Sequence, residues 1–413
     1  MSKRFFWLII IAIIFRLILA ASSFHPDLRT FQFAGQIVAN GNVLNIYDYM
    51  TSLPSSNPIT EMVVFNYPPA IYLFHGAANF LLAKVLGFTV MNDFLIEKVS
   101  DYGNILFNLH LLLLKLPYLP FDIMTAFFLI KIFQTRKEKI AALLIWLFNP
   151  VNLHATYMMG QFDIIPTFFT VLSLFLVKVG KLSHGAVALG MGAAFKIYPL
   201  FLLIPLVFLG KNWKERMKIF VLGILPYLIL TIPYLGSPGF RSTALVANQS
   251  LKSLYAEIPI SGGERLLLFP LLLVFFYLFF LYRKLKKEDL WQRYLIVLLL
   301  FFTFTHFHPQ WFLWLTPFLV IDLITSKFRH GVVAAILLAA NIILLTFFDP
   351  SLTVTLLAPL FTGLYSQPGI WELLKINIDY NMARSVFQTL LAGASVYIIY
   401  FYLLKEEKSK IEN

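Results

Sequence analysis

Two aspartates lie where apolar segments end, and their carboxylates could do acid–base chemistry. Asp27 comes two residues after His25, and Asp163 comes two residues after Gln161. A positioned carboxylate can take a proton from an attacking hydroxyl. We predict Asp27 as a general base with His25 as its neighbour or a ligand. The alternative for each aspartate is an N-cap of the helix that follows it, and a cap can also face a cavity.

A lone cation accompanies these acids. Lys196 opens the stretch Lys-Ile-Tyr-Pro, in which Tyr198 is the third residue, and the sequence on both sides is apolar. An ammonium group on the outer side of the membrane could meet a phosphate as a point charge. The alternative is a lysine that snorkels to the membrane interface.

A second polar cluster follows near residue 306. It contains His306, His308, Gln310 and Trp311. The two histidines are two residues apart and point to different sides of a helix, so a zinc pair is not favoured. We predict hydrogen bonds from the histidines to phosphate or sugar, with Trp311 as a stacking face. The alternative is an interfacial aromatic belt.

Other polar residues are less distinctive. Tyr67 precedes two prolines that would start a helix, and Arg241 and Arg265 are further candidates for binding phosphate. Asp122 lies within an apolar run, where an unpaired carboxylate costs several kcal/mol. Lys115 is two helical turns away, which is long for a direct ion pair.

The composition excludes a soluble protein. The chain has 413 residues, of which 59% are hydrophobic and only 13% charged, and its mean hydropathy is +0.77. Soluble domains have about 25% charged residues. The net charge of +12 and pI near 9.6 could indicate a nucleic-acid partner. Whether they do depends on where the basic residues lie in the chain. Cysteine is absent, which excludes disulfides and thiolate chemistry.

Twelve apolar runs predict an all-α polytopic membrane protein of about 12 transmembrane helices. Basic clusters follow every second run, which is the positive-inside pattern, and both termini are then cytoplasmic. The basic balance is therefore an insertion signal, and no nucleic-acid partner is predicted. The runs lie near residues 5–22, 115–133, 138–150, 162–178, 182–195, 198–210, 218–235, 266–282, 290–306, 309–325, 331–348 and 386–404.

This topology leaves three long external segments, 23–114, 236–265 and 349–385, around a single domain over residues 1–413. The apolar segment 68–86 could also cross, but its only partner, 105–114, is too short. We predict that 68–86 lies on the outer face as an amphipathic helix. The first run could instead be a cleaved signal peptide, but Arg16 interrupts it and a multi-span chain needs no cleavage.

In this order, the motifs resemble the GT-C superfamily of integral-membrane glycosyltransferases. The similarity is closest to the catalytic subunit of GPI mannosyltransferase I and its prokaryotic relatives. Each motif is weak alone, but the series is specific. The motifs are Arg16, the acidic Asp27, Tyr67 with Pro68 and Pro69, Lys115 with Asp122, Asn149-Pro150, Gly160 with Asp163, Lys196 to Pro199, and Gln310 to Trp314.

The resemblance implies an inverting transfer of a sugar, mannose by that resemblance, on the extracytoplasmic face of the cell membrane. The donor is a polyprenyl-phosphate sugar, and the acceptor is a lipid-linked molecule or a glycan. Asp27 is then the catalytic base, Asp163 binds acceptor or sugar hydroxyls or orients the base, and Gln161 binds substrate. A divalent metal, Mg²⁺ or Mn²⁺, is the cofactor to consider. The family's Asp-x-Asp motif has only its second residue here, and no residue is assigned to the metal.

Two other functions would also use many spans. A transporter or flippase of lipid-linked sugars should show internal two-fold repetition and helices broken at mid-membrane. The charges here cluster at the outer face instead. An oligosaccharide polymerase or ligase would typically have its largest external loop late in the chain, whereas here the first loop is the largest.

Overall fold

The computed structural model describes residues 3–54, 66–87, 90–91, 94–95, 102–245, 251–283 and 286–411. These residues form an assembly of α-helices with a single antiparallel hairpin of two strands among them, which agrees with the predicted all-α class.

The helices of the first half surround one apolar core. They are α1 (Lys3–Ser22), α2 (Asp27–Ala39), α3 (Ile46–Ser52), α5 (Pro69–Leu86), α7 (Ile105–Lys115), η2 (Leu116–Tyr118), α8 (Leu119–Ile132), α9 (Arg136–Leu147), α10 (Pro150–Asn152), η3 (Leu153–Met158), α11 (Ile164–Lys178), α12 (Leu182–Phe195) and α13 (Pro199–Val207).

The second half contains the hairpin and the longest helix. Its elements are α14 (Trp213–Thr231), η4 (Ile232–Tyr234), α15 (Pro238–Phe240), η5 (Arg241–Leu245), η6 (Lys252–Leu254), β1 (Glu257–Ser261), β2 (Glu264–Leu267), α17 (Leu268–Leu281), η7 (Lys287–Asp289), α18 (Leu290–Phe304), η8 (Pro309–Trp314), α19 (Thr316–Thr325), α20 (Gly331–Leu345), η9 (Pro350–Leu352), η10 (Thr355–Leu357), η11 (Thr362–Leu364), α21 (Ile370–Leu373) and α22 (Tyr380–Ile411).

Five helical segments of the described chain are long and apolar enough to cross a membrane, or six if the bent pair of α1 and α2 counts as one span. Other apolar helices, among them α11, α12 and α17, have 10–17 residues, fewer than the about 20 that a straight crossing needs. Several predicted spans therefore coincide with apolar helices, but the predicted number of twelve crossings is not established.

Two helix boundaries differ from the prediction. Residues 105–114 do not form a separate short helix, because α7, η2 and α8 continue as one helical segment over Ile105–Ile132. The predicted run 138–150 does not end at Asn149-Pro150, because α9, α10 and η3 also form one segment, Arg136–Met158. Proline is tolerated at the first helical position, and Asn149 caps the turn by accepting hydrogen bonds from the N–H groups of residues 151 and 152.

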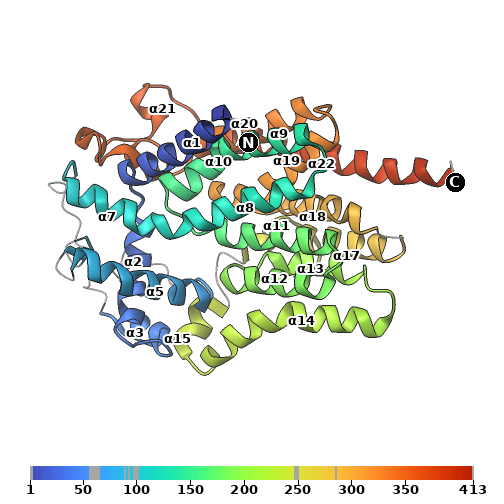
Figure 1. Ribbon diagram of the computed structural model, residues 1–413, viewed down its shortest axis with the longest axis horizontal. Helices are drawn as coiled ribbons and strands as arrows, with labels where there is room; N and C mark the ends of the chain where they lie inside the picture. The colour runs from blue at the N-terminus through green and yellow to red at the C-terminus, as the bar shows by residue number, and fades with distance from the viewer. Residues whose placement is uncertain are drawn as a thin grey trace.

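Helices α2, α3 and α5 gather at one end of the molecule, at the left of Figure 1, and α2 packs along α5. The helices α11, α12 and α14 form the best-packed layer beside them. Glycine permits the closest approach there, because a Cβ at Gly190 would lie 2.1 Å from the carbonyl oxygen of Gly223. Small residues serve the same purpose in other membrane helix pairs.

The carboxylate of Asp122 has a full set of partners inside the core. Arg16 Nε lies 2.6 Å from Asp122 Oδ2, so the ion pair joins α1 to α8. Three further donors complete the shell: Trp146 Nε1 at 2.7 Å, Asn152 Nδ2 at 2.8 Å and Tyr157 OH at 2.7 Å. A buried carboxylate of this kind needs both a counter-ion and hydrogen bonds. Its partner is Arg16 and not Lys115.

Lys115 instead holds the connection between α1 and α2. Its ammonium group donates to the carbonyl oxygens of Ala20 at 3.0 Å, Ser23 at 2.5 Å and Met158 at 3.1 Å. These carbonyls lie at the ends of helical segments, where the backbone has no partner of its own. Lys115 is fully buried and fixes the place where the chain turns toward Asp27.

Candidate active site

Most of the predicted site residues line one cavity of about 480 Å³. The cavity lies where the connections after α1, α12 and α18 meet. Of the predicted residues, those in its wall are His25, Asp27, Tyr67, Lys196, Tyr198, His308, Gln310 and Trp311.

Asp27 is the first residue of α2, and its carboxylate faces this cavity. The axes of α1 and α2 differ by 86° at this point, so the bend presents the start of α2 to the interior. No side chain caps this helix, and the residue at the cap position is Pro26. The Asp27 side chain is 38% exposed, and Gln161 Nε2 donates a hydrogen bond of 2.6 Å to its Oδ2. The carboxylate is therefore oriented but accessible, as a general base must be.

His25 supports the backbone beside Asp27. Its Nδ1 accepts the Asp27 N–H at 3.2 Å and lies 3.7 Å from Asp27 Oδ2. Burial lowers the pKa of His25, although Asp27 opposes the shift, so the ring is neutral at pH 7. Because Nδ1 is the acceptor, the proton of the neutral ring is on Nε2.

Gln161 reaches Asp27 because the chain passes very close to α2 at the preceding residue, Gly160. Gly160 has φ +73°, a backbone conformation that side chains disfavour, and a Cβ there would lie 2.6 Å from Leu28 Cδ2. The Gln161 N–H donates to the Ala155 carbonyl at 2.8 Å, which fixes the turn. The glycine thus allows the contact between Gln161 and Asp27.

Asp163 lies behind the cavity wall and is fully buried. It occupies the N-cap position of α11, but its side chain makes no capping hydrogen bond. Its Oδ1 instead accepts from Lys196 Nζ at 2.7 Å and from Trp314 Nε1 at 2.6 Å. Asp163 therefore acts on the cavity through Lys196.

Lys196 extends from the end of α12 into a cage of aromatic rings. Its Nζ lies 5.0 Å from the ring centre of Phe162, 5.1 Å from those of Trp311 and Trp314, and 6.0 Å from that of Tyr67. Burial lowers the pKa of Lys196, and Asp163 opposes this shift. Ring faces stabilise a partly desolvated cation. The ammonium group thus lies in the wall of the cavity in a place from which water is largely excluded.

Tyr198 is held by stacking. Its ring lies parallel to that of Trp314, with 4.1 Å between the centroids and 6° between the planes. Trp311 also stacks on Trp314, with 5.2 Å between the centroids and 12° between the planes. These rings form a flat, rigid wall beside Lys196.

His308 is neutral and is anchored by a lysine. Burial lowers the pKa of His308 to about 3, and the charges of Lys252 and Lys196 add to the shift. Lys252 Nζ lies 2.8 Å from His308 Nε2. Lysine can only donate, so Nε2 accepts and the ring carries its proton on Nδ1.

Gln161 and Asp163 contact the lining residues Asp27 and Lys196 without lining the cavity themselves, and three further predicted residues do not line it either. His306 lines a separate cavity on the other side of the turn from His308. Arg241 Nη1 donates to the carbonyl oxygens of Leu235 and Gly236 at 2.8 and 3.1 Å. Arg265 forms an ion pair with Glu257 across the β1–β2 hairpin.

The cavity also contains residues that the sequence reasoning missed. The most notable is Asp349, and Phe201, Tyr227, Phe301 and Phe348 add apolar surface. Asp349 follows the apolar run 331–348, so the signal that identified Asp27, an acid at the outer end of an apolar segment, could have found it.

The described residues contain no group of three or more His, Asp or Glu side chains that could hold a metal ion. Mg²⁺ prefers several oxygen ligands in near-octahedral geometry. Mg²⁺ or Mn²⁺ bound at this cavity would therefore need oxygen ligands from substrate or water in addition to the described side chains.

Residues 105–307, just under half of the chain, match the model of glycosyltransferase family 87. The matched range includes Asp163, Lys196 and Lys252 but ends before His308 and begins after Asp27. No match was found among curated proteins or among solved structures. The match does not support the closer relationship to GPI mannosyltransferase I. The chain thus combines apolar helices long enough to span a membrane with similarity to glycosyltransferase family 87 over just under half of its length.

Proposed function

We propose that the protein transfers a sugar, with mannose the first candidate, from a polyprenyl-phosphate donor to a lipid-linked or glycan acceptor with inversion at C1. The observation that carries this proposal is the convergence of Asp27, Lys196 and His308 on one cavity. An accessible carboxylate, a caged cation and a neutral imidazole are the groups that such a transfer needs.

Asp27 acts as the general base. As the acceptor hydroxyl attacks C1 of the donor sugar, the hydroxyl proton moves to the Asp27 carboxylate, and the bond from C1 to the phosphate oxygen breaks. The phosphate leaves with the bonding electron pair. Gln161 occupies one side of Oδ2, which orients the carboxylate toward the cavity. General-base assistance accelerates a reaction by about 10²–10⁴-fold.

Lys196 and His308 stabilise the leaving phosphate. The phosphate gains negative charge as the C1–O bond breaks, and the Lys196 cation is already held in place by Asp163. The neutral ring of His308 can donate its Nδ1–H. Preorganised donors in a site from which water is excluded are worth more than the same groups in water.

The apolar part of the cavity supports a lipid donor. Phe201 on α13, Tyr227 on α14 and Phe301 on α18 line it, so the polar groups share the cavity with aromatic surface from three helices. A polyprenyl chain needs such a surface, whereas a soluble nucleotide sugar would need a phosphate-binding loop, and the sequence has no glycine-rich loop of that kind.

The positive-inside pattern supports an extracytoplasmic site. Lys196 lies just before α13, which begins at Pro199, and the basic residues 211, 214, 216 and 218 follow the other end of that helix. Because those basic residues are predicted to face the cytoplasm, the cavity lies at the external end of α13. We therefore propose an active site on the external face of the cell membrane, with both termini cytoplasmic.

The test is Asp27→Asn in membranes supplied with a panel of polyprenyl-phosphate sugars. Mass spectrometry of the lipids and glycans should show a new glycosidic bond with the wild-type protein and a rate at least about 100-fold lower with the variant. The control is Asp379→Asn. Asp379 caps α22 through the N–H groups of Asn381 and Met382, and asparagine also caps helices.

Transfer by Asp27→Asn at a rate within about tenfold of wild type would show that the base is another group. Movement of intact lipid-linked sugar across the membrane without a new glycosidic bond would reject the enzyme and favour a transporter. Formation of long sugar polymers from lipid-linked oligosaccharides would favour a polymerase.

A further inference from the structure

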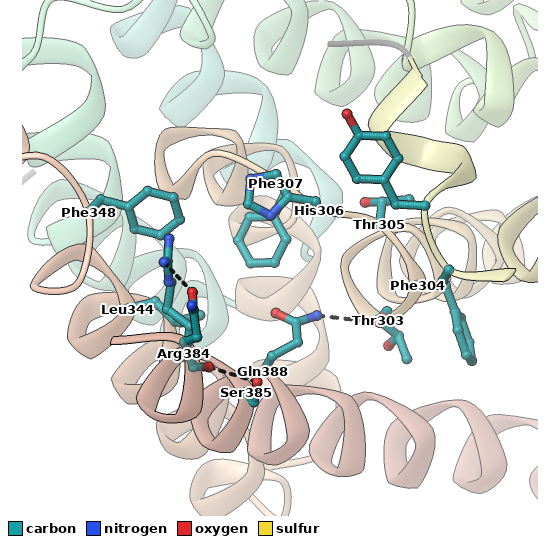
Figure 2. Close-up of a pocket in the computed structure, with 13 residues that line it drawn as sticks. Thr303, Phe304, Thr305, His306, Phe307, Leu344, Phe348, Arg384, Ser385 and Gln388 are labelled. Carbon is teal, nitrogen blue, oxygen red and sulfur yellow. Dashed lines mark hydrogen bonds between the residues drawn. The ribbon is translucent and has the colours of Figure 1, made fainter. Parts of the chain in front are cut away.

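A second cavity of about 510 Å³ lies beside the first one, between the end of α18 and the start of α22. Figure 2 shows Arg384 beside Phe348, with Gln388 and Ser385 on α22 and His306 across the space from them. Phe348 lines both cavities. The second cavity is therefore a separate space that shares one aromatic wall with the candidate active site.

The start of α22 is fixed to the end of α18. Gln388 Nε2 donates to the carbonyl oxygen of Phe302 at 2.8 Å and to that of Thr303 at 3.3 Å, and Figure 2 shows the second of these bonds. Those carbonyls lie in the last turn of α18, where they lack helical partners. The two helices thus hold the second cavity in a defined shape.

Arg384 is oriented in the wall of this cavity without a counter-ion among the described residues. Its Nε donates to the Tyr380 carbonyl at 3.2 Å and its Nη2 to Asn381 Oδ1 at 2.8 Å, both on α22. The guanidinium lies 5.7 Å from the ring centre of Phe348. No residue that lines the cavity is an Asp or Glu. Its Nη1 makes no hydrogen bond to the described residues, so the guanidinium has donors left for a ligand.

His306 adds a second donor, and its surroundings are cationic. Burial lowers the pKa of His306, and the charges of Lys252 and Arg384 add to the shift, so the ring is neutral at pH 7 and carries one N–H. Its backbone N–H donates to the Lys252 carbonyl at 3.4 Å. The turn that separates the cavities thus places His306 in the second cavity and His308 in the first.

We propose that the second cavity binds a phosphate-like anionic group of the acceptor. This inference rests on the proposed function. The proposed reaction needs an acceptor hydroxyl beside Asp27 in the first cavity. An anionic group in the second cavity would be separated from the first cavity only by the side chain of Phe348. A third cavity, which borders Pro26, lacks any Lys or Arg in its lining and contains Asp349, so it does not favour an anion.

The binding test uses the full chain in a neutral detergent with inorganic phosphate and with a short-chain phosphatidic acid as separate probes. We expect saturable binding of at least one probe, and an affinity about 10-fold or more lower in Arg384→Gln, because a charge-assisted hydrogen bond is lost. Binding of both probes identifies the phosphate group itself. Binding of the lipid alone identifies a lipid-linked source, and binding of phosphate alone identifies a soluble one.

Arg329→Gln is the matched control. It removes the same charge, and Arg329 precedes His330, whose ring lies 6.0 Å from that of Tyr402 on α22. Tyr402 is 18 residues beyond Arg384, or about 27 Å along the helix. No binding of either probe, or equal binding by Arg384→Gln and wild type, would overturn the proposal.

Kinetic measurements distinguish a failure of this anion site from a failure of the proposed function. Arg384→Gln should raise KM for the acceptor about 10-fold and leave KM for the donor unchanged. Asp27→Asn should abolish transfer and leave the binding of phosphate unchanged. If Arg384 determines phosphate binding but no transfer is found, the proposed function fails and the anion site remains. If transfer depends on Asp27 but Arg384→Gln changes neither binding nor KM, the anion site fails.

Discussion

At the scale of single residues, the candidate site depends on which side chains are occupied and which are left accessible. Asp163 is fully buried and bonded to both Lys196 and Trp314, whereas Asp27 has one strong donor and a partly exposed carboxylate. The two aspartates look alike in the sequence. Their surroundings differ, so that Asp27 is placed to act as a base and Asp163 holds the Lys196 cation in position.

The first prediction at this scale concerns Gln161 as a positioning residue. Gln161→Ala removes the 2.6 Å hydrogen bond to Asp27 and lets the carboxylate rotate away from the acceptor hydroxyl. We expect kcat to fall about tenfold with little change in KM, because orientation affects the transition state more than binding. Steady-state kinetics with the active donor measures both.

The control is Gln134→Ala, which changes the same residue type in the connection between α8 and α9, away from the cavity. It should leave both constants unchanged. An equal loss in both variants, or a rise in KM for Gln161→Ala with unchanged kcat, would contradict a positioning role.

The residue types of the site could be predicted, but their pairings could not. Asp27, Lys196 and His308 stand at the ends of apolar runs, where polar groups are conspicuous. The bond from Gln161 to Asp27 joins residues 134 positions apart, and that from Trp314 to Asp163 joins residues 151 apart. Such contacts depend on how helices pack, and no local periodicity encodes them. Arg241 and Arg265 are equally conspicuous in the sequence, but they bind groups close to them in the chain and do not reach the cavity.

At the scale of elements, close helix packing positions the ends of α12 and α13, and thereby Lys196. Helices α12 and α14 make the most extensive contact between any two elements. Gly190 and Gly223 allow this approach, since a Cβ at Gly190 would overlap a backbone carbonyl oxygen that cannot move independently. The glycine is therefore required by packing and not by an unusual backbone angle.

The prediction for these helices compares two glycine-to-alanine substitutions, which should change the free energy of unfolding differently. Gly190→Ala should lower the free energy of unfolding by about 1–3 kcal/mol, because α12 and α14 must move apart. Gly393→Ala, in the interior of α22 with open space around the added methyl group, should be neutral or stabilising by about 0.5–1 kcal/mol. Thermal unfolding in one detergent compares them.

Equal melting temperatures for Gly190→Ala and wild type would show that the two helices can separate without cost. A strong loss of stability in Gly393→Ala would instead show that α22 is covered by a partner. Both variants keep the candidate site residues unchanged, so activity at low temperature reports whether the folded fraction retains function.

Helix boundaries were predicted less well than the helices themselves. Residues 105–132 contain two prolines, Pro117 and Pro120, and a lysine at 115, and each of these reads locally as an interruption. The structure accommodates Pro117 in the short η2 turn and Pro120 in the first turn of α8, and Lys115 finds carbonyl partners on other segments. Those partners are distant in the sequence, so the continuity of this helix could not be inferred from local signals.

At the scale of the whole molecule, the question is which end of the helical layer faces outward. The C-terminus lies at the right of Figure 1, opposite the end where α2, α3 and α5 gather. The predicted cytoplasmic C-terminus would then place α5 on the outer side. Helix α5 is nevertheless apolar and long enough to cross by length and composition. Its packing favours a position on the outer side, because its main partner is α2 and it contacts α12 and α14 much less.

The last prediction tests this arrangement with single cysteines, since the chain has none of its own. Lys84 is exposed near the end of α5, Ser261 is exposed in the hairpin, and Arg329 is exposed in the turn before α20. A membrane-impermeant maleimide should label Lys84→Cys and Ser261→Cys in intact cells, and Arg329→Cys only after permeabilisation.

If α5 crossed the membrane, Pro69 at its start, next to the cavity, would stay outside, and Lys84, near its other end, would face the cytoplasm. Labelling of Lys84→Cys only after permeabilisation would therefore show that α5 spans. Another segment would then have to cross to restore the orientation of the following helices. Labelling of Arg329→Cys in intact cells would reverse the whole topology and place the cavity on the cytoplasmic side.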